Sequence, residues 1–407
     1  MEPKIRLKGF GGEWEETKFD SLAKIRRGLT YSPSNITAKG VRVLRSSNVN
    51  EDTFITSEED VFVEEGCVNI PLANDGDILI TAANGSPRLV GKHAVIETNG
   101  SKMAPGGFMV LAMTDEPYFL NTCMSSPWYK KFLKTGVAGG NGAIGNLNKT
   151  SLSESMFYIP TDKVERDSLA SYFQHLDNLI LSTTKKIESL KQVKAASLQS
   201  MFPQEGETVP RVRFKGFEGE WKQIVMSDVG YMTAGGTPST FEDSYWNGDI
   251  NWLQSGAVQN NIILPSAVER KITKEGLSNS AAHLVQKDSV LIAITGATCA
   301  NIGYLTFNST ANQSVVSVEP YRGFDSKFVY QSLMINRNQI LSFKGGSAQS
   351  GVTLSNLKKM SILCPDYQEQ QKIGCFFFNI EEMIMQCMTR LEKLKQIKTA
   401  CLDNMFV

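Results

Sequence analysis

The chain has 407 residues, of which 41% are hydrophobic and 21% charged, and its formal net charge is zero. This length exceeds one hydrophobic core, so we expect two or more domains, and the neutral balance argues against a strongly basic nucleic-acid binder while leaving room for local basic patches. No apolar run approaches the roughly 18 residues of a membrane helix, and the seven cysteines are scattered without a CxxC pair. We therefore expect a cytoplasmic protein with reduced thiols, no membrane association and no zinc site.

The opening segment, Arg6-Leu-Lys-Gly-Phe-Gly-Gly-Glu-Trp14, returns 207 positions later as Arg213-Phe-Lys-Gly-Phe-Glu-Gly-Glu-Trp221. A second pair follows at a shift of 204, where Leu190-Lys-Gln-Val-Lys194 returns as Leu394-Lys-Gln-Ile-Lys398. Such a long internal duplication predicts two related halves. Two halves suit a bipartite target or two copies of one partner.

The segments at about 15–160 and 222–364 are rich in Gly, Asn, Ser and Thr and contain short apolar runs. These runs read as strands at 41–44, 77–81, 288–292 and 315–318. One helical stretch interrupts each segment, at Ser126–Leu133 and at Phe328–Leu341. We therefore predict two mixed, β-rich globules that resemble each other only in outline.

A long helix is predicted after each globule. After Pro160 comes Asp162-x-x-Glu165, and after Pro365 comes Asp366-x-x-Glu369, which are candidate capping boxes in which the Glu reaches back to the cap. From these points the shift of 204 holds without a gap, with 13 identities in the 41 positions of 162–202. Pro203 ends the first helix, and 204–210 reads as an exposed linker.

Apolar residues recur along both helices in alternating steps of four and three, as in the seam of a coiled coil. The seam residues are Leu169, Phe173, Leu176, Ile180, Ile187 and Leu190 in the first helix and Ile373, Phe377, Ile380, Ile384, Leu391 and Leu394 in the second. A lone helix cannot bury such a stripe. We expect the two helices to form an intramolecular, antiparallel coiled coil.

Polar residues gather after the predicted strands of both globules. In the first half they are Arg42, Arg45, Ser46, Ser47 and Asn48, and then Asn84, Ser86, Arg88 and Lys92; in the second they are Gln254, Ser255, Thr295 and Thr298. Asn and Gln can bond adenine, Arg can bond guanine, and Ser and Thr reach bases or phosphates. The competing interpretation is ordinary turn chemistry.

No catalytic or metal-binding motif accompanies these residues. Gly140-Asn-Gly-Ala-Ile-Gly145 matches a dinucleotide pattern, but a helical stretch precedes it and its counterpart at 345–351 breaks the spacing, so we interpret both as Gly-rich loops. None of the three histidines has a ligand partner at helical spacing. The pattern favours a binding protein over an enzyme.

At this point the sequence resembles the specificity (S, HsdS) subunits of Type I restriction–modification enzymes. The most specific motifs lie in the second half: Thr233-Ala-Gly-Gly-Thr-Pro-Ser239, Tyr245-Trp-Asn-Gly-Asp-Ile-Asn-Trp-Leu253, Thr295-Gly-Ala-Thr298 and Asn312-Gln313. The first half carries a variant with Arg27-Gly-Leu-Thr-Tyr31, Leu44-Arg-Ser-Ser-Asn-Val49 and Asp60-Val-Phe-Val63. These motifs add candidate DNA-binding residues, namely Gly235, Gly236, Thr237, Ser239, Asn312 and Gln313.

The resemblance implies an α+β fold with a pseudo-twofold internal repeat. Two β-rich target-recognition domains (1–160 and 204–364) would alternate with a central and a distal spacer helix (161–203 and 365–407). Each domain would read half of a bipartite site in double-stranded DNA. The helices would set the spacer and dock two methyltransferase (M) subunits, with restriction/motor (R) subunits joining for cleavage.

Catalysis would belong to those partner subunits, which would carry S-adenosylmethionine, Mg and ATP, and this chain would hold no cofactor. Two alternatives stay open: a pseudo-symmetric protein-binding scaffold without DNA contact, and a stand-alone enzyme of unknown class.

Overall fold

The computed structural model of the protein describes residues 1–50, 52–138, 145–344 and 351–407. They form two compact units: unit 1 contains Met1–Thr184 and Thr389–Val407, and unit 2 contains Lys185–Met388. Each unit therefore holds one globule and a section of both long helices. The Gly-rich runs considered as nucleotide loops lie outside the described residues, except for their last glycines at 145 and 351.

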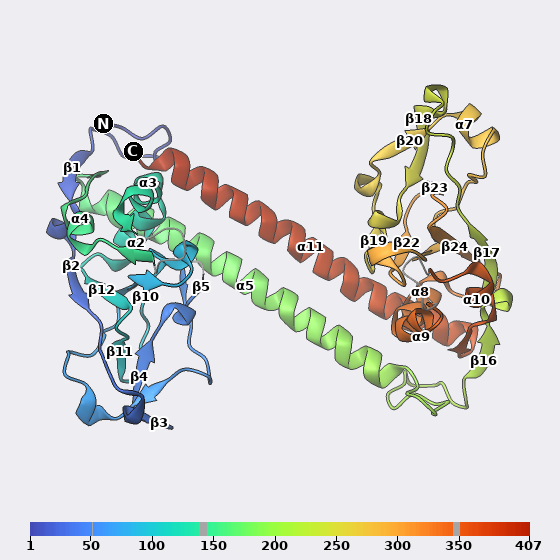
Figure 1. The fold of residues 1–407 in the computed structure, drawn as a ribbon, viewed down its shortest axis with the longest axis horizontal. Coiled ribbons are helices and arrows are strands. Elements are labelled where there is room, and N and C mark those ends of the chain that lie inside the picture. Colours follow the sequence, from blue (N-terminus) through green and yellow to red (C-terminus); the bar gives the residue numbers. More distant parts are fainter. Residues whose placement is uncertain (51, 139–144, 345–350) are drawn as a thin grey trace. The chain divides into compact units, whose positions relative to one another are not determined.

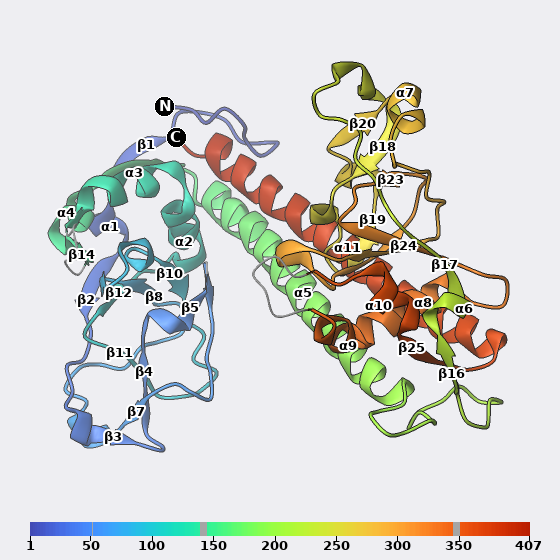
Figure 2. The ribbon, with the colours of Figure 1, turned by 45° about the vertical axis from the view of Figure 1, so that its right-hand side comes forward.

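In unit 1, strands β2, β12, β8 and β10 lie side by side in one sheet (Figure 2). A second sheet has the order β11-β4-β7-β3, a third β13-β14-β9, and the pairs β1-β15 and β5-β6 complete the set. The bounds are β1 Glu15–Lys18, α1 Phe19–Leu22, β2 Lys24–Arg27, β3 Ile36–Thr37, β4 Val41–Leu44, β5 Val49–Asn50, β6 Thr53–Phe54, β7 Phe62–Val63, β8 Ile78–Thr81, β9 Ala83–Asn84, β10 His93–Val95, β11 Met103–Pro105, β12 Met109–Met113, α2 Pro117–Ser125, α3 Pro127–Gly136, β13 Val137–Ala138, β14 Gly145–Leu147, α4 Lys149–Glu154 and β15 Met156–Ile159.

Unit 2 has a five-stranded sheet of order β17-β24-β21-β22-β19, a three-stranded sheet β20-β18-β23 and the pair β16-β25. The bounds are β16 Lys222–Val225, α6 Met226–Val229, β17 Gly230–Ala234, β18 Trp246–Leu253, β19 Asn261–Ile263, β20 Arg270–Ile272, α7 Lys274–Ser278, β21 Val290–Ala293, β22 Ile302–Leu305, β23 Thr310–Ala311, β24 Val315–Pro320, α8 Ser326–Ile335, α9 Arg337–Ser342, α10 Leu354–Lys359 and β25 Ser361–Cys364.

The two globules share one topology. The order β2-β12-β8-β10 in unit 1 matches β17-β24-β21-β22 in unit 2, and the terminal pair β1-β15 matches β16-β25. In both, a parallel pair follows: β11 with β4, and β23 with β18. The predicted strands are present at β4, β8, β21 and β24 because their β-branched and leucine residues are buried. The α+β internal repeat is confirmed.

The long helices are α5, Lys163–Met201, and α11, Tyr367–Met405. In unit 1, Tyr172 of α5 bonds Cys401 of α11, and Asp177 of α5 pairs with Lys398 of α11. The contact residue on α11 moves toward the N-terminus as the one on α5 moves toward the C-terminus, so the two helices run antiparallel. In unit 2, Lys194 contacts Glu381 and Phe202 packs on Phe377 in the same sense. The predicted antiparallel pairing of the helices is confirmed within each unit, and all twelve predicted seam residues are buried or half-buried.

The repeated arginine of the opening motif binds the repeated glutamate at the start of the helix. Arg6 donates to both carboxylate oxygens of Glu165 at 2.8 and 2.7 Å, and Arg213 donates to both of Glu369 at 2.7 Å. The capping-box prediction was therefore wrong for both glutamates: each turns toward a guanidinium more than 150 residues away in sequence. At the cap itself, Asp162 Oδ1 accepts from Val164 N at 2.8 Å.

The chain termini meet inside unit 1 (Figure 1). Ile5 N donates to Asn404 O at 2.9 Å, and Trp14 packs edge-on against Phe406 with ring centroids 5.8 Å apart. In unit 2 the segment that follows the linker makes the equivalent contacts, because Val212 N donates to Ser200 O at 2.9 Å and Trp221 packs against Phe202 with ring centroids 5.5 Å apart. The two chain termini in unit 1 are thus held together by non-covalent contacts, and the equivalent segments of unit 2 make the same contacts while being joined by the linker.

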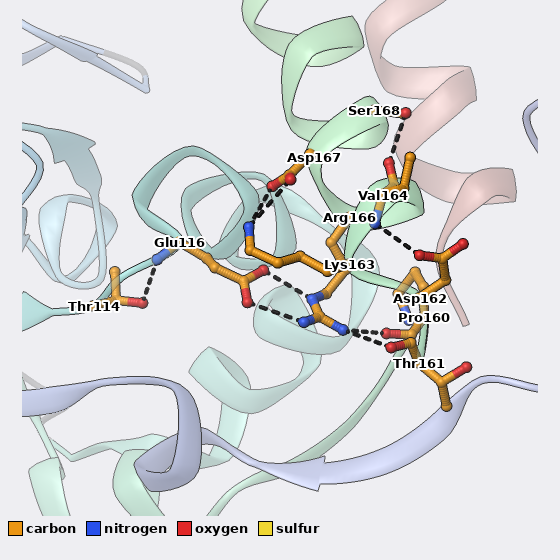
Figure 3. A network of polar contacts seen from close by, with 10 residues as sticks. All are labelled: Thr114, Glu116, Pro160, Thr161, Asp162, Lys163, Val164, Arg166, Asp167 and Ser168. Atoms are coloured by element: carbon orange, nitrogen blue, oxygen red, sulfur yellow. Dashed lines mark hydrogen bonds and ion pairs between the residues drawn. The ribbon is translucent and has the colours of Figure 1, made fainter.

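A polar network ties the globule of unit 1 to the first turn of α5 (Figure 3). Arg166 donates to both oxygens of Glu116 at 2.8 and 3.1 Å and to the carbonyls of Pro160 and Thr161. In unit 2, Gln370 stands at the position of Arg166 and accepts from Asp325 N at 3.1 Å. Each helix start is therefore bonded to its own globule in a different way, through a side-chain ion pair in unit 1 and a side-chain-to-backbone hydrogen bond in unit 2.

Two helical predictions need correction. The stretch at 328–341 forms two helices, α8 and α9, which meet at Asn336 with ψ of 15°. Helix α2 lies just before the predicted stretch at 126–133 and was missed, since its pattern is almost wholly buried rather than amphipathic.

Candidate nucleic-acid interface

In unit 1 three chain segments converge where β4 and β8 end. Gly106 N donates to Leu44 O at 2.8 Å, while Ala82 N and Ala83 N donate to Phe108 O at 2.9 and 3.0 Å. The turn at 106–108, between β11 and β12, is thereby held against both strand ends. Glycine is required at position 28, which faces this turn, because a Cβ built on Gly28 would lie 1.9 Å from Gly106 O.

A cavity of about 780 Å³ opens at this junction. Arg45, Ser46 and Asn84 are its polar lining from the two strand ends. Arg45 Nη2 donates to Tyr31 Oη at 2.6 Å, and Asn84 Nδ2 donates to Ser46 Oγ at 3.1 Å. The structure brings together these predicted residues, with Ser86 N bonded to Asn84 Oδ1 and Ser47 exposed beside them.

Two predicted DNA-binding residues have structural partners instead. Asn48 is only 1% exposed and bonds Arg45 N, Ile55 O and Asp60. Arg42 pairs with Asp60, donates to Ser57 O and lies 4.7 Å from the Phe62 ring centroid. These contacts shape the loop that presents Arg45.

Arg88 and Lys92 line a different cavity of unit 1, of about 510 Å³. Lys398 lies in its wall, 2.8 Å from Asp52 and 2.7 Å from Asp177. Burial opposes the charge of Lys398, but the two carboxylates outweigh it and raise the pKa of Lys398 above its ordinary value. Burial likewise opposes the Asp52 carboxylate, yet His93 and Lys398 hold the pKa of Asp52 below its ordinary value.

Unit 2 repeats the junction with other side chains. Asn312 N donates to Leu253 O at 2.9 Å, as Gly106 does to Leu44, and Ile294 N donates to Ser314 O at 2.9 Å, as Ala82 does to Phe108. Gln254 therefore stands at the position of Arg45. The predicted residues gathered around this junction are Gln254, Ser255, Thr295, Thr298, Asn312 and Gln313, each exposed or half-buried.

The glycines of the Thr233–Ser239 motif are packing positions. A Cβ on Gly235 would lie 2.2 Å from Ala311 O, and one on Gly236 would lie 2.2 Å from the backbone of Ala281. Trp252 Nε1 donates to Gly236 O at 3.0 Å. The two glycines thus let the motif pack closely against the backbone at 281–282 and 311–312.

The other two predicted DNA-binding residues of the motif are Thr237 and Ser239. Thr237 Oγ1 donates to Gln313 Oε1, so one predicted contact residue positions another. Ser239 is exposed, and its carbonyl accepts from Trp246 Nε1 at 3.0 Å.

Sequence reasoning missed Phe108 and the role of Tyr31. Phe108 is 67% exposed on the turn that corresponds to 312–314 in unit 2. The signal in the sequence was Pro105-Gly-Gly-Phe108, a turn between two apolar runs, but only strand pairing relates it to Asn312 and Gln313.

Within the described ranges, no group of three or more His, Cys, Asp or Glu side chains could hold a metal ion. No helix in the same part of the chain is long and apolar enough to cross a membrane. All seven cysteines are free thiols.

Comparison with known proteins agrees with these observations. A family model described as the Type I restriction modification DNA specificity domain matches residues 218–398. The Type I restriction enzyme MjaIX specificity subunit of Methanocaldococcus jannaschii is 27% identical over 46% of this chain and 44% of its own length, so the chain matches less than half of that relative. The putative type I restriction enzyme MjaX specificity subunit of the same organism is 22% identical over 95% of this chain and 91% of its own length.

The fold is similar to the crystal structure of the Type I restriction–modification system S subunit from M. genitalium, with a TM-score of 0.70 at 15% identity over 100% of this chain and 99% of that chain. The chain is thus a duplicated α+β protein whose two globules share their main sheet topology and differ in the side chains at their strand ends. Residues 218–398 thus match the specificity domain of Type I restriction–modification systems, and the chain is similar to the specificity subunits of those systems.

Proposed function

We propose that the chain recognises a bipartite site in double-stranded DNA, each globule reading one half. The observation that carries this proposal is the repeated junction of strand ends, which presents Arg45 and Ser46 in unit 1 but Gln254 and Ser255 in unit 2. Arginine pairs with guanine and glutamine with adenine in the major groove, so a shared frame with exchanged side chains suits two different half-sites.

The remaining domain assignments follow as part of the proposal. Target-recognition domains at 1–160 and 204–364 alternate with spacer helices at 161–203 and 365–407. The helices dock two methyltransferase subunits, for which the exposed apolar side chains Val193, Met383 and Ile397 provide contact area. Catalysis, S-adenosylmethionine, Mg and ATP belong to the methyltransferase and restriction subunits.

The spacer helices act as a ruler in this proposal. Each has 39 residues, about 58 Å at ~1.5 Å per residue. Removing one heptad from each, 184–190 and 384–390, shortens them by about 10 Å, or roughly three base pairs at ~3.4 Å each. Sequencing of methylated DNA should then show the same half-sites with a shorter gap, and an unchanged gap would contradict the ruler.

Exchange of one domain tests whether each globule reads only one half of the DNA site. Replacing residues 20–155 with the matching segment of another specificity subunit should change one half-site of the methylated motif and leave the other intact. A motif altered in both halves would contradict the assignment.

The salt dependence of DNA binding distinguishes the proposed function from the competing function of a protein-binding scaffold. DNA binding by the chain with its methyltransferase partner should weaken steeply as salt rises, because phosphate contacts release counterions. A complex that binds no DNA at low salt would favour the scaffold.

A further inference from the structure

Phe108 is an apolar side chain held out at a polar junction. Its carbonyl accepts two backbone hydrogen bonds, from Ala82 and Ala83, and Gly106 is bonded to Leu44, so the backbone on both sides of the turn is fixed. The ring is nevertheless 67% exposed. A fixed backbone with an exposed aromatic ring is preorganised for contact with a ligand rather than for the protein core.

The cavity beside Phe108 is mainly apolar. Its lining includes Leu29, Tyr31, Pro33, Ile36 and Met109, and Ile36 is itself exposed. Of the described residues that line it, Arg45 alone is charged, and its charge is positive. An apolar surface beside a guanidinium suits DNA, which carries negative phosphates and presents hydrogen-bond acceptors next to the apolar methyl group of thymine in its major groove.

The equivalent turn of unit 2 has the opposite chemistry. Ser314 stands at the position of Phe108, and Asn312 and Gln313 replace the two glycines before it. Amides read bases through hydrogen bonds, whereas phenylalanine can contact only the one apolar group in the major groove, the 5-methyl group of thymine.

We propose that Phe108 and the apolar cavity beside it recognise the 5-methyl group of a thymine in the half-site read by the first globule. This inference rests on the proposed function and adds the chemistry that distinguishes the two readers. Arg45, tied to Tyr31 at the rim, would bond the adjoining base.

The test uses the complex of the chain with its methyltransferase subunits and DNA duplexes carrying the motif found by methylation sequencing. Each thymine of the first half-site is replaced in turn by uracil, which removes only the methyl group. We expect one position at which this change weakens binding about fourfold, the effect of exposing one buried methyl group. Phe108→Ser should bind thymine and uracil equally at that position, and Phe108→Leu should keep most of the discrimination.

Uracil scanning of the second half-site is the internal control, since Phe108→Ser should leave its profile unchanged and so show that the variant is folded. A uracil effect that persists in Phe108→Ser, no uracil effect at all, or a first half-site without thymine on either strand would overturn the inference. Absence of sequence-specific binding to every duplex would instead contradict the proposed function.

Discussion

Lys398 Nζ lies 2.7 Å from Asp177 Oδ1, and the same ion pair recurs as Lys194 and Glu381, each residue shifted by 204 positions. Each globule then adds its own partner. Asp52 lies 2.8 Å from Lys398 in unit 1, whereas Gln331 donates to Glu381 at 2.8 Å in unit 2. The helix pair is therefore joined by a repeated contact, to which each globule attaches in its own way.

Replacing Lys398 with methionine should loosen unit 1. The change leaves Asp52 and Asp177 without a shared cation in a half-buried site, and we expect a loss of roughly 2 kcal/mol, the scale of a charged hydrogen bond. Hydrogen exchange measured by mass spectrometry should show faster exchange in the peptides of unit 1 and unchanged exchange in those of unit 2. Lys163→Met is the control, because its pair with Asp167 on the same helix is 61% exposed on both sides.

The pH dependence of this deficit follows from the two shifted pKa values. The pKa of Asp52 lies below its ordinary 3.8 in the folded protein, so its contribution is present above that value and is lost as pH falls through the folded pKa. The pKa of Lys398 lies above its ordinary 10.5, so its contribution is present below 10.5 and is lost as pH rises through the folded pKa. The difference between wild type and Lys398→Met should be flat near neutrality and should shrink in strong acid; a difference that persists unchanged to pH 2 would contradict the role of Asp52.

Arg213 and Arg211 offer a matched comparison within one segment. The Glu369 carboxylate that Arg213 binds is 1% exposed, whereas the pair of Arg211 with Glu207 is 62% and 38% exposed. Arg213→Met leaves a buried carboxylate unpaired and should destabilise unit 2 by about 3 kcal/mol, while Arg211→Met should cost less than about 1 kcal/mol. Chemical denaturation followed by tryptophan fluorescence would measure both, and equal costs would show that the repeated arginine is not a structural lock.

Gly236→Ala separates packing from DNA contact. The new Cβ would lie 2.2 Å from the Ala281 backbone, so the second globule must shift, at a cost of about 2 kcal/mol or more. At Gly256 a Cβ meets nothing within 4 Å, and Gly256→Ala should change stability by less than about 0.5 kcal/mol. Thermal unfolding of both variants without DNA is the measurement. A Gly236→Ala variant with wild-type stability and impaired DNA binding would show that this glycine contacts DNA and does not serve packing alone.

Local patterns predicted the parts of this fold that depend on local physics. Heptad spacing located the long helices, and β-branched runs located β4 and β24, because those signals lie within one element. The partner of Glu165 was not predictable in this way: an acidic residue in the first turn fits a capping box, and only the fold brings Arg6 to it.

The candidate interface was predictable to a similar extent. Strand ends marked Arg45 and Gln254 correctly as neighbours of a junction, since chain direction and turn residues are visible in sequence. Burial separates Asn48 from Arg45, although the two are three residues apart, and burial is a tertiary property. Phe108 was missed because its equivalence to Ser314 exists only through strand pairing.

The contacts between the chain termini in unit 1 match those around the linker in unit 2, and this match predicts that the chain tolerates a circular permutation that exchanges the order of its halves. Trp14 N donates to Met1 O as Trp221 N donates to Thr208 O, both at 2.8 Å, so Met1 stands where Thr208 does. A chain that begins at Thr208, runs to Val407, continues through the relocated residues 204–207 into Met1 and ends at Pro203 keeps every residue of the protein. It also gives unit 1 the linker of unit 2.

We expect this permuted chain to fold with the same secondary structure and a melting temperature within a few degrees of wild type, because both opened bonds, 203–204 and 207–208, lie at the linker and no helix or strand is cut. Together with the methyltransferase subunits that we propose as its partners, it should direct modification of the same DNA motif as the wild-type chain. Circular dichroism and methylation sequencing measure the two outcomes. The control permutant opens the chain between Ile292 and Ala293 in the fully buried strand β21, and it should not fold. If both permutants failed alike, the contacts between the termini would not be equivalent to the linker, and the duplication would be a resemblance of sequence without a shared junction.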